Sequence, residues 1–236
     1  MFSSAAPTAI TVREYAETLA SGPGNSPDTT IASSVDNTIT GAAGTEVELV
    51  CTAVGGNPAP RLTWWVGGAE VPSTLAQEDR RGSGDAANST WTSRARLRLP
   101  VSRADHAAQV RCEAEHDALN TPLVGLATLN ILYSPRVMAN IQQQGSASSN
   151  SSSSLREGEA VTLTCEVDSN PAAGRVSWRR SGAAAILTGQ ANFTISPVTR
   201  DTAGSYECVA ENSLGISQPA TVQLNVDCKY IFKYII

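Results

Sequence analysis

The 236-residue chain has only two histidines, His106 and His116, which limits the chemistry it could perform. No nucleophile motif accompanies the pair His116-Asp117, so the sequence gives no reason to expect a catalytic triad. The cysteines do not form the Cys-x-x-Cys pairs typical of zinc sites. Glu113, Glu115 and Asp117 alternate along one predicted strand, which is more typical of a solvated face than of a calcium site. We therefore expect no enzyme, no metal and no cofactor.

Clusters of basic residues and long apolar runs are also missing. The formal net charge is −5, and without a basic block the sequence argues against nucleic-acid binding. No stretch of about 20 apolar residues could span a bilayer, and the apolar tail at 228–236 is far too short. Arg13, Glu14 and Glu17 interrupt the N-terminal stretch, so we expect no secretory signal there.

Four of the five cysteines stand in a repeated pattern. The interval from Cys51 to Trp64 is the same as the interval from Cys165 to Trp178. An internal repeat of this kind indicates two similar domains, which the chain length also allows. Paired cysteines in sandwich spacing are typical of an oxidising compartment, whereas Cys228 follows the second domain and has no partner inside it.

The strongest local signal is the sequence from Asp201 to Cys208. Tyr206 stands two positions before Cys208, as in the tyrosine corner of a β-sandwich, and both side chains face the same side of a strand. The first repeat has Cys112 at the equivalent position but Val110 in place of the tyrosine. Alternating apolar residues in both repeats predict half-buried strands and therefore an all-β chain.

Composition sets the expected domain limits. The first residues are rich in Ala, Ser, Thr, Gly and Pro, and the serine run at 146–154 interrupts the second domain as an expected flexible loop. The sequence Tyr133-Ser134-Pro135 marks the boundary between the domains. We predict a disordered or remnant segment at 1–30, domain one at 31–133, domain two at 134–227 and a short tail at 228–236.

The motifs of both repeats resemble a known family. Domain two, with Arg156-Glu157-Gly158-Glu159, Asn170-Pro171 and Asp201-x-x-Gly204-x-Tyr206-x-Cys208, looks like an I-set or C2-type immunoglobulin domain of adhesion molecules. Domain one, with Gly55-Gly56-Asn57-Pro58 and Trp64-Trp65, looks like the CD80-like C2 set. This order of domains is similar to that of the nephrin, Kirre and sidestep groups of adhesion receptors.

The resemblance implies two tandem immunoglobulin-like β-sandwiches. It pairs Cys51 with Cys112 and Cys165 with Cys208, and it places Trp64, Trp178 and Tyr206 in the cores. In such receptors a CD80-like domain commonly follows a V-type domain that carries much of the partner contact, and residues 1–30 do not look like that domain. We therefore expect an internal pair from a longer ectodomain, located outside the plasma membrane.

Several surface residues are candidates for modification or binding. Three sequons predict N-glycosylation at Asn88, Asn150 and Asn192. Trp65 lies on the outer face of its strand, where it is either an interaction anchor or covered by side chains of the neighbouring strand.

A short basic row alternates with apolar residues in domain one. Arg94, Arg96 and Arg98 form it, and an ordinary solvent face is the favoured interpretation. The alternative is a site for an acidic partner or a sulfated glycan.

The favoured function is adhesion or recognition of another cell-surface protein, either homophilic or with a different immunoglobulin-type receptor. One alternative is a ligand-binding segment of a receptor kinase or phosphatase, and another is an intracellular scaffold of the muscle-protein type. The paired cysteines and the sequons count against the intracellular scaffold.

Overall fold

The computed structural model describes residues 4–15, 37–82, 89–143 and 155–227, and the chain divides into two compact units. Unit 1 is residues 1–132 and unit 2 is residues 133–236, so the division lies one position before the predicted boundary. Strand β9 (Leu123–Gln143) continues through the division and contributes its first part to unit 1 and its second part to unit 2.

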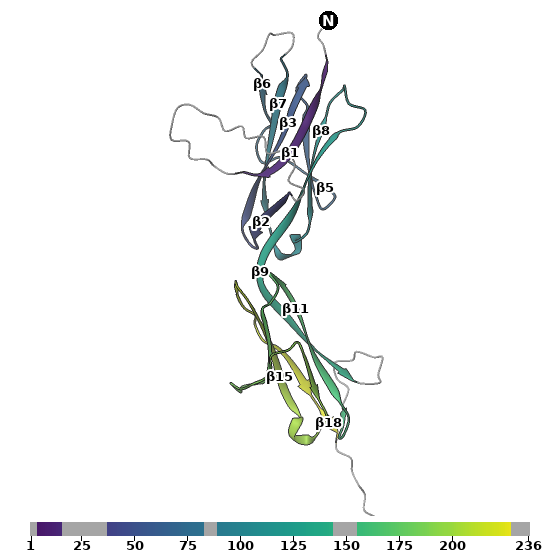
Figure 1. Ribbon diagram of the computed structural model, residues 1–236, viewed down its shortest axis with the longest axis vertical. Helices are drawn as coiled ribbons and strands as arrows, with labels where there is room; N and C mark the ends of the chain where they lie inside the picture. Colours follow the sequence, from purple (N-terminus) through teal and green to yellow (C-terminus); the bar gives the residue numbers. More distant parts are fainter. Residues whose placement is uncertain (1–3, 16–36, 83–88, 144–154, 228–236) are drawn as a thin grey trace, which may run out of the picture. The chain divides into compact units, whose positions relative to one another are not determined.

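Unit 1 is a sandwich of two sheets (Figure 1). The first sheet is antiparallel, in the order β1 (Ala5–Glu14), β3 (Glu46–Asn57), β7 (Trp91–Pro100) and β6 (Glu78–Arg81). The second has the order β2 (Thr38–Ala42), β9, β8 (Gln109–Glu115), β4 (Arg61–Val66) and β5 (Ala69–Val71). Within it, β2 is parallel to β9. The 3-10 helix η1 (Arg103–Asp105) precedes β8.

The core of unit 1 lies between these sheets. Alternate residues of β3, β7 and β8 point inward, because successive side chains of a strand face opposite sides. A disulfide joins Cys51 to Cys112 across the sandwich, and the neighbouring Trp64 is fully buried. These are the paired cysteines and the buried tryptophan that the resemblance implies for domain one.

The prediction for residues 1–30 is wrong for the part that forms β1. This strand pairs with β3, with Val12 opposite Cys51 and only 2 % exposed. Ile10 and Val12 alternate with Thr11 and Arg13, which suits a half-buried strand. The overall composition of the segment concealed this short pattern, and its pairing partner lies far away along the chain. Residues 16–36 lie outside the described residues.

Unit 2 repeats the two-sheet arrangement. One sheet has the order β14 (Asn192–Ile195), β11 (Val161–Asn170) and β9. The other contains β13 (Ile186–Thr188), β12 (Arg175–Arg180) and β15 (Gly204–Asn212), and β15 also pairs with β16 (Gly215–Ile216) and β17 (Ala220–Leu224). Strand β10 (Leu155–Arg156) runs parallel to β18 (Val226–Asp227). The 3-10 helix η2 (Arg200–Thr202) precedes β15.

The core of unit 2 has the tyrosine corner that the sequence predicts. The Tyr206 hydroxyl donates a hydrogen bond to the carbonyl oxygen of Thr202 over 2.7 Å. A disulfide joins Cys165 to Cys208, and the buried Trp178 donates its indole N–H to the carbonyl oxygen of Ala191.

Candidate interaction surfaces

The outer face of the second sheet of unit 1 is formed by β5, β4, β8 and β9. We call it the Trp65 face, after the residue that the sequence singles out. Trp65 lies opposite Arg111, which lies opposite Leu126, and the next row contains Thr63, Glu113 and Val124. Directly opposed side chains of neighbouring strands share one face of a sheet. The face therefore combines an aromatic ring, two aliphatic side chains and a pair of opposite charges.

Trp65 is half-buried because a side chain of the neighbouring strand covers it. The guanidinium of Arg111 lies 5.0 Å from the centre of the Trp65 ring, within range of a cation–π interaction. Arg111 also forms an ion pair of 3.2 Å with Glu113. The Trp65 indole nitrogen is buried and has no hydrogen-bond partner among the described residues. Arg111 thus covers part of the ring, whereas a role of Trp65 in binding stays a prediction.

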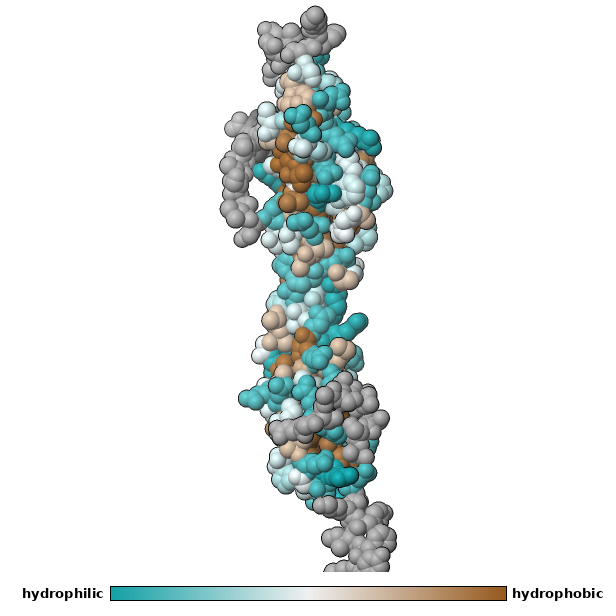
Figure 2. Space-filling model, turned by 90° about the vertical axis from the view of Figure 1, so that its right-hand side faces the viewer, coloured by the Kyte–Doolittle hydropathy of each residue, from teal (hydrophilic) through white to brown (hydrophobic). Residues whose placement is uncertain are grey.

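The most exposed apolar side chains of the Trp65 face come from β9. Val124 is 45 % exposed and Leu126 is 46 % exposed. Figure 2 shows hydrophobic residues gathered on one side of unit 1. Leu129 and Ile131 of this strand are buried, and the alternation of apolar residues was not followed back from them to Val124 and Leu126 in the sequence. That extension places both residues outward and could have found them.

The predicted basic row lies on the opposite sheet of unit 1. Arg94, Arg96 and Arg98 project outward from β7, whereas Ala95 and Leu97 between them are buried. Arg98 forms an ion pair of 3.4 Å with Glu48 of β3. The Arg96 guanidinium lies 4.3 Å from the centre of the Tyr15 ring. The three arginines therefore share one face, as predicted, and two of them have neighbours there.

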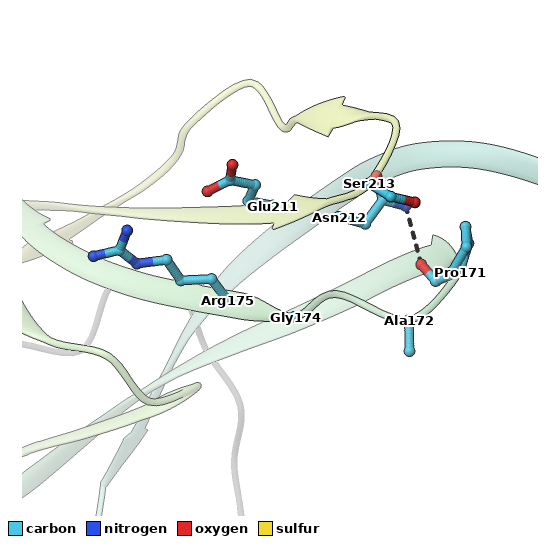
Figure 3. A pocket seen from close by; sticks show the side chains of 7 residues that line it. All are labelled: Pro171, Ala172, Gly174, Arg175, Glu211, Asn212 and Ser213. Atoms are coloured by element: carbon cyan, nitrogen blue, oxygen red, sulfur yellow. Dashed lines mark hydrogen bonds between the residues drawn. The ribbon is translucent and has the colours of Figure 1, made fainter.

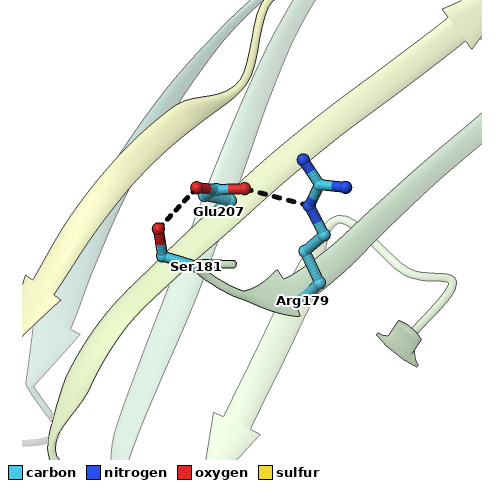
Figure 4. A network of polar contacts seen from close by, with 3 residues as sticks. All are labelled: Arg179, Ser181 and Glu207. Carbon is cyan, nitrogen blue, oxygen red and sulfur yellow. Dashed lines mark hydrogen bonds and ion pairs between the residues drawn. The ribbon is translucent and has the colours of Figure 1, made fainter. Parts of the chain in front are cut away.

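The corresponding outer face of unit 2 carries an ion pair instead of the tryptophan. Arg179 has the position of Trp65, because each directly follows the buried tryptophan of its unit. Glu207 has the position of Arg111, because each directly precedes the second cysteine of its unit. The Arg179 Nε donates to Glu207 Oε2 over 2.9 Å, and the Ser181 hydroxyl donates to Oε1 over 2.6 Å (Figure 4). The hydrogen bond from Ser181, assisted by Arg179, lowers the pKa of Glu207 below its ordinary value of 4.5.

Two isoleucines border a shallow depression on the same face of unit 2. Ile186 of β13 is 51 % exposed and Ile216 of β16 is 63 % exposed. The depression between them has a volume of about 310 Å³, and Ser177 and Val209 contribute to its lining. This face is therefore polar at its centre and apolar at its edges.

A second hollow of unit 2 lies beside Asn212, where the hairpin after β15 meets the turn after β11 (Figure 3). Its volume is about 370 Å³. The buried Asn212 side chain donates to the carbonyl oxygens of Pro171 and Tyr133, and its own oxygen accepts the backbone N–H of Leu214. Asn212 thus holds two loops together and is occupied by structural bonds.

His116 has the same structural role in unit 1. It follows the second cysteine of its unit at the same interval at which Asn212 follows Cys208. Its Nε2 lies 3.0 Å from the carbonyl oxygen of Pro58, and its Nδ1 accepts the backbone N–H of Ala118 over 3.0 Å. His106 accepts the backbone N–H of Ile131. Both histidines therefore serve backbone groups of unit 1.

The predicted modification sites are placed only in part. Asn192 begins β14 and is exposed, and Thr194 of the same sequon is exposed as well. Asn88, Asn150 and Cys228 lie outside the described residues.

Metal-binding clusters and membrane-spanning helices are both missing from the described residues. Among them, no group of three or more His, Cys, Asp and Glu side chains could hold a metal ion. No helix within these ranges is long and apolar enough to cross a membrane.

Models of two domain families match the chain. Residues 29–122 match the CD80-like C2-set immunoglobulin domain, and residues 145–212 match the immunoglobulin domain. These matches confirm the predicted pair of immunoglobulin-like sandwiches and the CD80-like character of the first.

Adhesion proteins are among the similar proteins. Human cell adhesion molecule 1 is 29 % identical over 182 residues, which are 75 % of this chain and 38 % of that protein. Human nephrin is 36 % identical over 146 residues, or 59 % of this chain and 10 % of nephrin. The full ectodomain of mouse nectin-like molecule 4 is 25 % identical, with a TM-score of 0.66 over 81 % of this chain and 62 % of that one. The chain thus spans about two fifths of the length of cell adhesion molecule 1.

Proposed function

Because the chain belongs to the immunoglobulin superfamily and is similar to cell adhesion molecules over most of its length, we propose that it is an extracellular recognition module that binds another cell-surface protein. The two units are then part of a larger receptor ectodomain, since the similar adhesion proteins are longer than this chain. Binding depends on the fit between surfaces and needs no bond chemistry.

The exposed apolar strip of the Trp65 face is the observation that carries this proposal. Val124 and Leu126 are nearly half exposed and lie directly beside the charged side chains of Arg111 and Glu113. Interfaces between proteins combine an apolar centre with a polar surround, and a few large side chains supply most of the affinity. The covering Arg111 also holds the Trp65 ring in place, which reduces the entropy lost on binding.

A pair of matched variants tests this assignment. Leu126→Asp places a charge in the centre of the Trp65 face, whereas Val54→Asp places the same charge on the opposite sheet at an equally exposed position, since both side chains are 46 % exposed. Beads coated with the secreted chain are mixed with beads coated with the same chain, with the ectodomain of human cell adhesion molecule 1 or with that of nephrin. We expect Leu126→Asp to weaken association at least about tenfold and Val54→Asp to leave it unchanged.

Two results would contradict the proposal. One is the absence of association with every coated surface. The other is an equal loss in both variants, which would show that the Trp65 face has no special part in binding.

The extracellular location also implies a modified surface. We propose that Asn192 carries an N-linked glycan, because its side chain is exposed at the start of an edge strand. Intact mass of the secreted chain, measured with and without glycosidase, should show a glycan that Asn192→Gln reduces. Free thiols and no glycan on a folded product would favour the intracellular scaffold.

A further inference from the structure

We propose that the outer face of the first sheet of unit 1 binds a sulfated polysaccharide. This basic face consists of outward side chains of β1, β3, β7 and β6. Its arginines are Arg13, Arg80, Arg94, Arg96 and Arg98. The choice of a polysaccharide rests on the extracellular location proposed above, whereas the face itself follows from the register of the strands.

Strand register brings these arginines together from three separate segments. Val50 of β3 lies opposite both Arg13 of β1 and Arg96 of β7, so the two arginines share a face. Arg80 of β6 lies opposite Thr92, which is two positions before Arg94 on the same side of β7. The sequence reveals only the row on β7, because β1 and β6 join it through pairing.

Burial confirms that this side of the sheet faces solvent. On β7 the residues next to the arginines are buried on the inner side, with Ser93, Ala95 and Leu97 at most 2 % exposed, and Val12 before Arg13 on β1 is 2 % exposed. Arg13, Arg80 and Arg94 are all exposed. Arg13, Arg80 and Arg94 therefore lie on an accessible surface.

Neighbouring glutamates neutralise only part of this charge. Glu48 pairs with Arg98 over 3.4 Å, and Glu78 lies 3.9 Å from Arg96. Arg13, Arg80 and Arg94 form no ion pair with a described residue. Five arginines against the outward glutamates Glu46, Glu48 and Glu78 leave the face positive within a chain whose formal net charge is −5.

The spacing of the arginines suits a long, linear polyanion. Alternate residues of a strand lie about 6.8 Å apart, and neighbouring strands lie about 4.8 Å apart. A chain with regularly repeated sulfate groups can contact several such guanidinium groups at once, and each group can donate two parallel hydrogen bonds to an oxyanion. A single small anion would contact only one or two of them.

The test measures binding of the full secreted chain to immobilised heparin across a range of salt concentrations. Arg13, Arg80 and Arg94 are replaced together by Ser, because they have no ion pairs with described residues and their loss should leave the fold intact. The matched control replaces Arg61, Arg175 and Arg200 by Ser, which removes the same charge from exposed sites away from this face. Unchanged thermal unfolding verifies the fold of each variant.

We expect the unmodified chain to bind heparin and the first triple variant to bind at least about tenfold more weakly, with little change in the control. The slope of log affinity against log salt should decrease by about one for each arginine that contacts a sulfate. Hyaluronan, which has carboxylates but no sulfates, should bind much more weakly than heparin.

Other outcomes would overturn the inference. Equal losses in both triple variants would mean that only net charge matters. Tighter binding of single-stranded DNA or polyglutamate than of heparin would exclude a sulfated polysaccharide as the preferred partner. This assay uses no adhesion partner, so its outcome is independent of the Leu126→Asp experiment. Either proposal can therefore fail while the other holds.

Discussion

The two units share a core and differ on their surfaces. Each has a disulfide that joins two sheets and a fully buried tryptophan at the same interval after the first cysteine. At the outward positions beside that core, unit 1 has Trp65 against Arg111, and unit 2 has Arg179 against Glu207. The comparison teaches that the inward positions of both units preserve a common sandwich, whereas their outward positions differ in charge and in aromatic content.

The turn before the second cysteine also differs. In unit 2 the Tyr206 hydroxyl binds the backbone of Thr202. Unit 1 has one more residue between the buried Val101 and its second cysteine than unit 2 has after Val198, and Ala107 adopts a positive φ of 63° there. Backbone hydrogen bonds from Ala107 to Leu129 and from Leu129 to Ala108 then hold the turn. A longer turn thus replaces the side-chain bond of the tyrosine corner.

Removal of the disulfides should have the largest effect on this comparison. Replacing both cysteines of one bridge by Ala should destabilise its unit by about 2–5 kcal/mol. The Cys51–Cys112 bridge closes 61 residues and the Cys165–Cys208 bridge closes 43, so the entropy of loop closure favours the first by about 0.3 kcal/mol. When urea unfolding is followed separately in each unit, the midpoint of the unit without its bridge should fall, and the midpoint of the other unit should not change. Movement of both transitions together would contradict independent units.

The residues that join the loops come next. Asn212→Ala removes three hydrogen bonds of a buried side chain and should cost about 2–3 kcal/mol in unit 2. His116→Ala removes two bonds and should cost about 1–2 kcal/mol in unit 1, and His116→Asn should restore part of the loss. Denaturant midpoints of the two transitions measure both effects. A His116→Ala effect as large as that of Asn212→Ala would argue against this ranking by bond number and burial.

Loss of the tyrosine-corner hydrogen bond should lower the free energy of unfolding by about 1 kcal/mol. Tyr206→Phe should destabilise unit 2 by that amount, because it removes the bond to Thr202 and leaves the ring in place. Val110→Tyr should not stabilise unit 1 in return, because Val110 is fully buried and a larger side chain overpacks its site. Thermal unfolding of the two variants shows whether each substitution raises or lowers stability. A gain in stability from Val110→Tyr would show that the longer turn can accept the corner.

The smallest expected effect is on the stability of unit 2 at acidic pH. The lowered pKa of Glu207 means that the folded state favours its carboxylate, so this contribution is present above pH 4.5 and is lost as the pH falls through the lowered value. Unfolding midpoints of the chain and of Glu207→Gln should therefore differ more at about pH 7 than at about pH 3. An equal difference at both pH values would contradict the assignment.

The sequence allowed prediction of the features that depend on local spacing. The Cys–Trp interval, the Tyr206-x-Cys208 pattern and the alternation of Arg94, Arg96 and Arg98 identified the fold, the cores and one row of the surface. Each follows from spacing within a short stretch of chain.

Features that arise from strand pairing were not predictable in this way. Strand β1 was missed because its pairing with β3 involves distant residues, and with it the position of Arg13 on the same face as Arg96 was missed. The cover of Arg111 over Trp65 likewise depends on the register between β4 and β8. Sequence reasoning gave His116 no catalytic role, but its structural role and its likeness to Asn212 appear only through their shared bonds to the loop prolines.

Near the start of each unit, the chain passes from one group of paired strands to another. Strand β1 belongs to one sheet and β2 to the other in unit 1, and β9 and β10 belong to different groups of strands in unit 2. The chain therefore leaves one ladder of hydrogen bonds before it joins the next, and added residues at that point interrupt neither ladder. Lengthening a connection raises its closure entropy only slowly. We therefore expect an affinity tag inserted after Tyr15 or after Gln143 to leave both ladders of its unit intact.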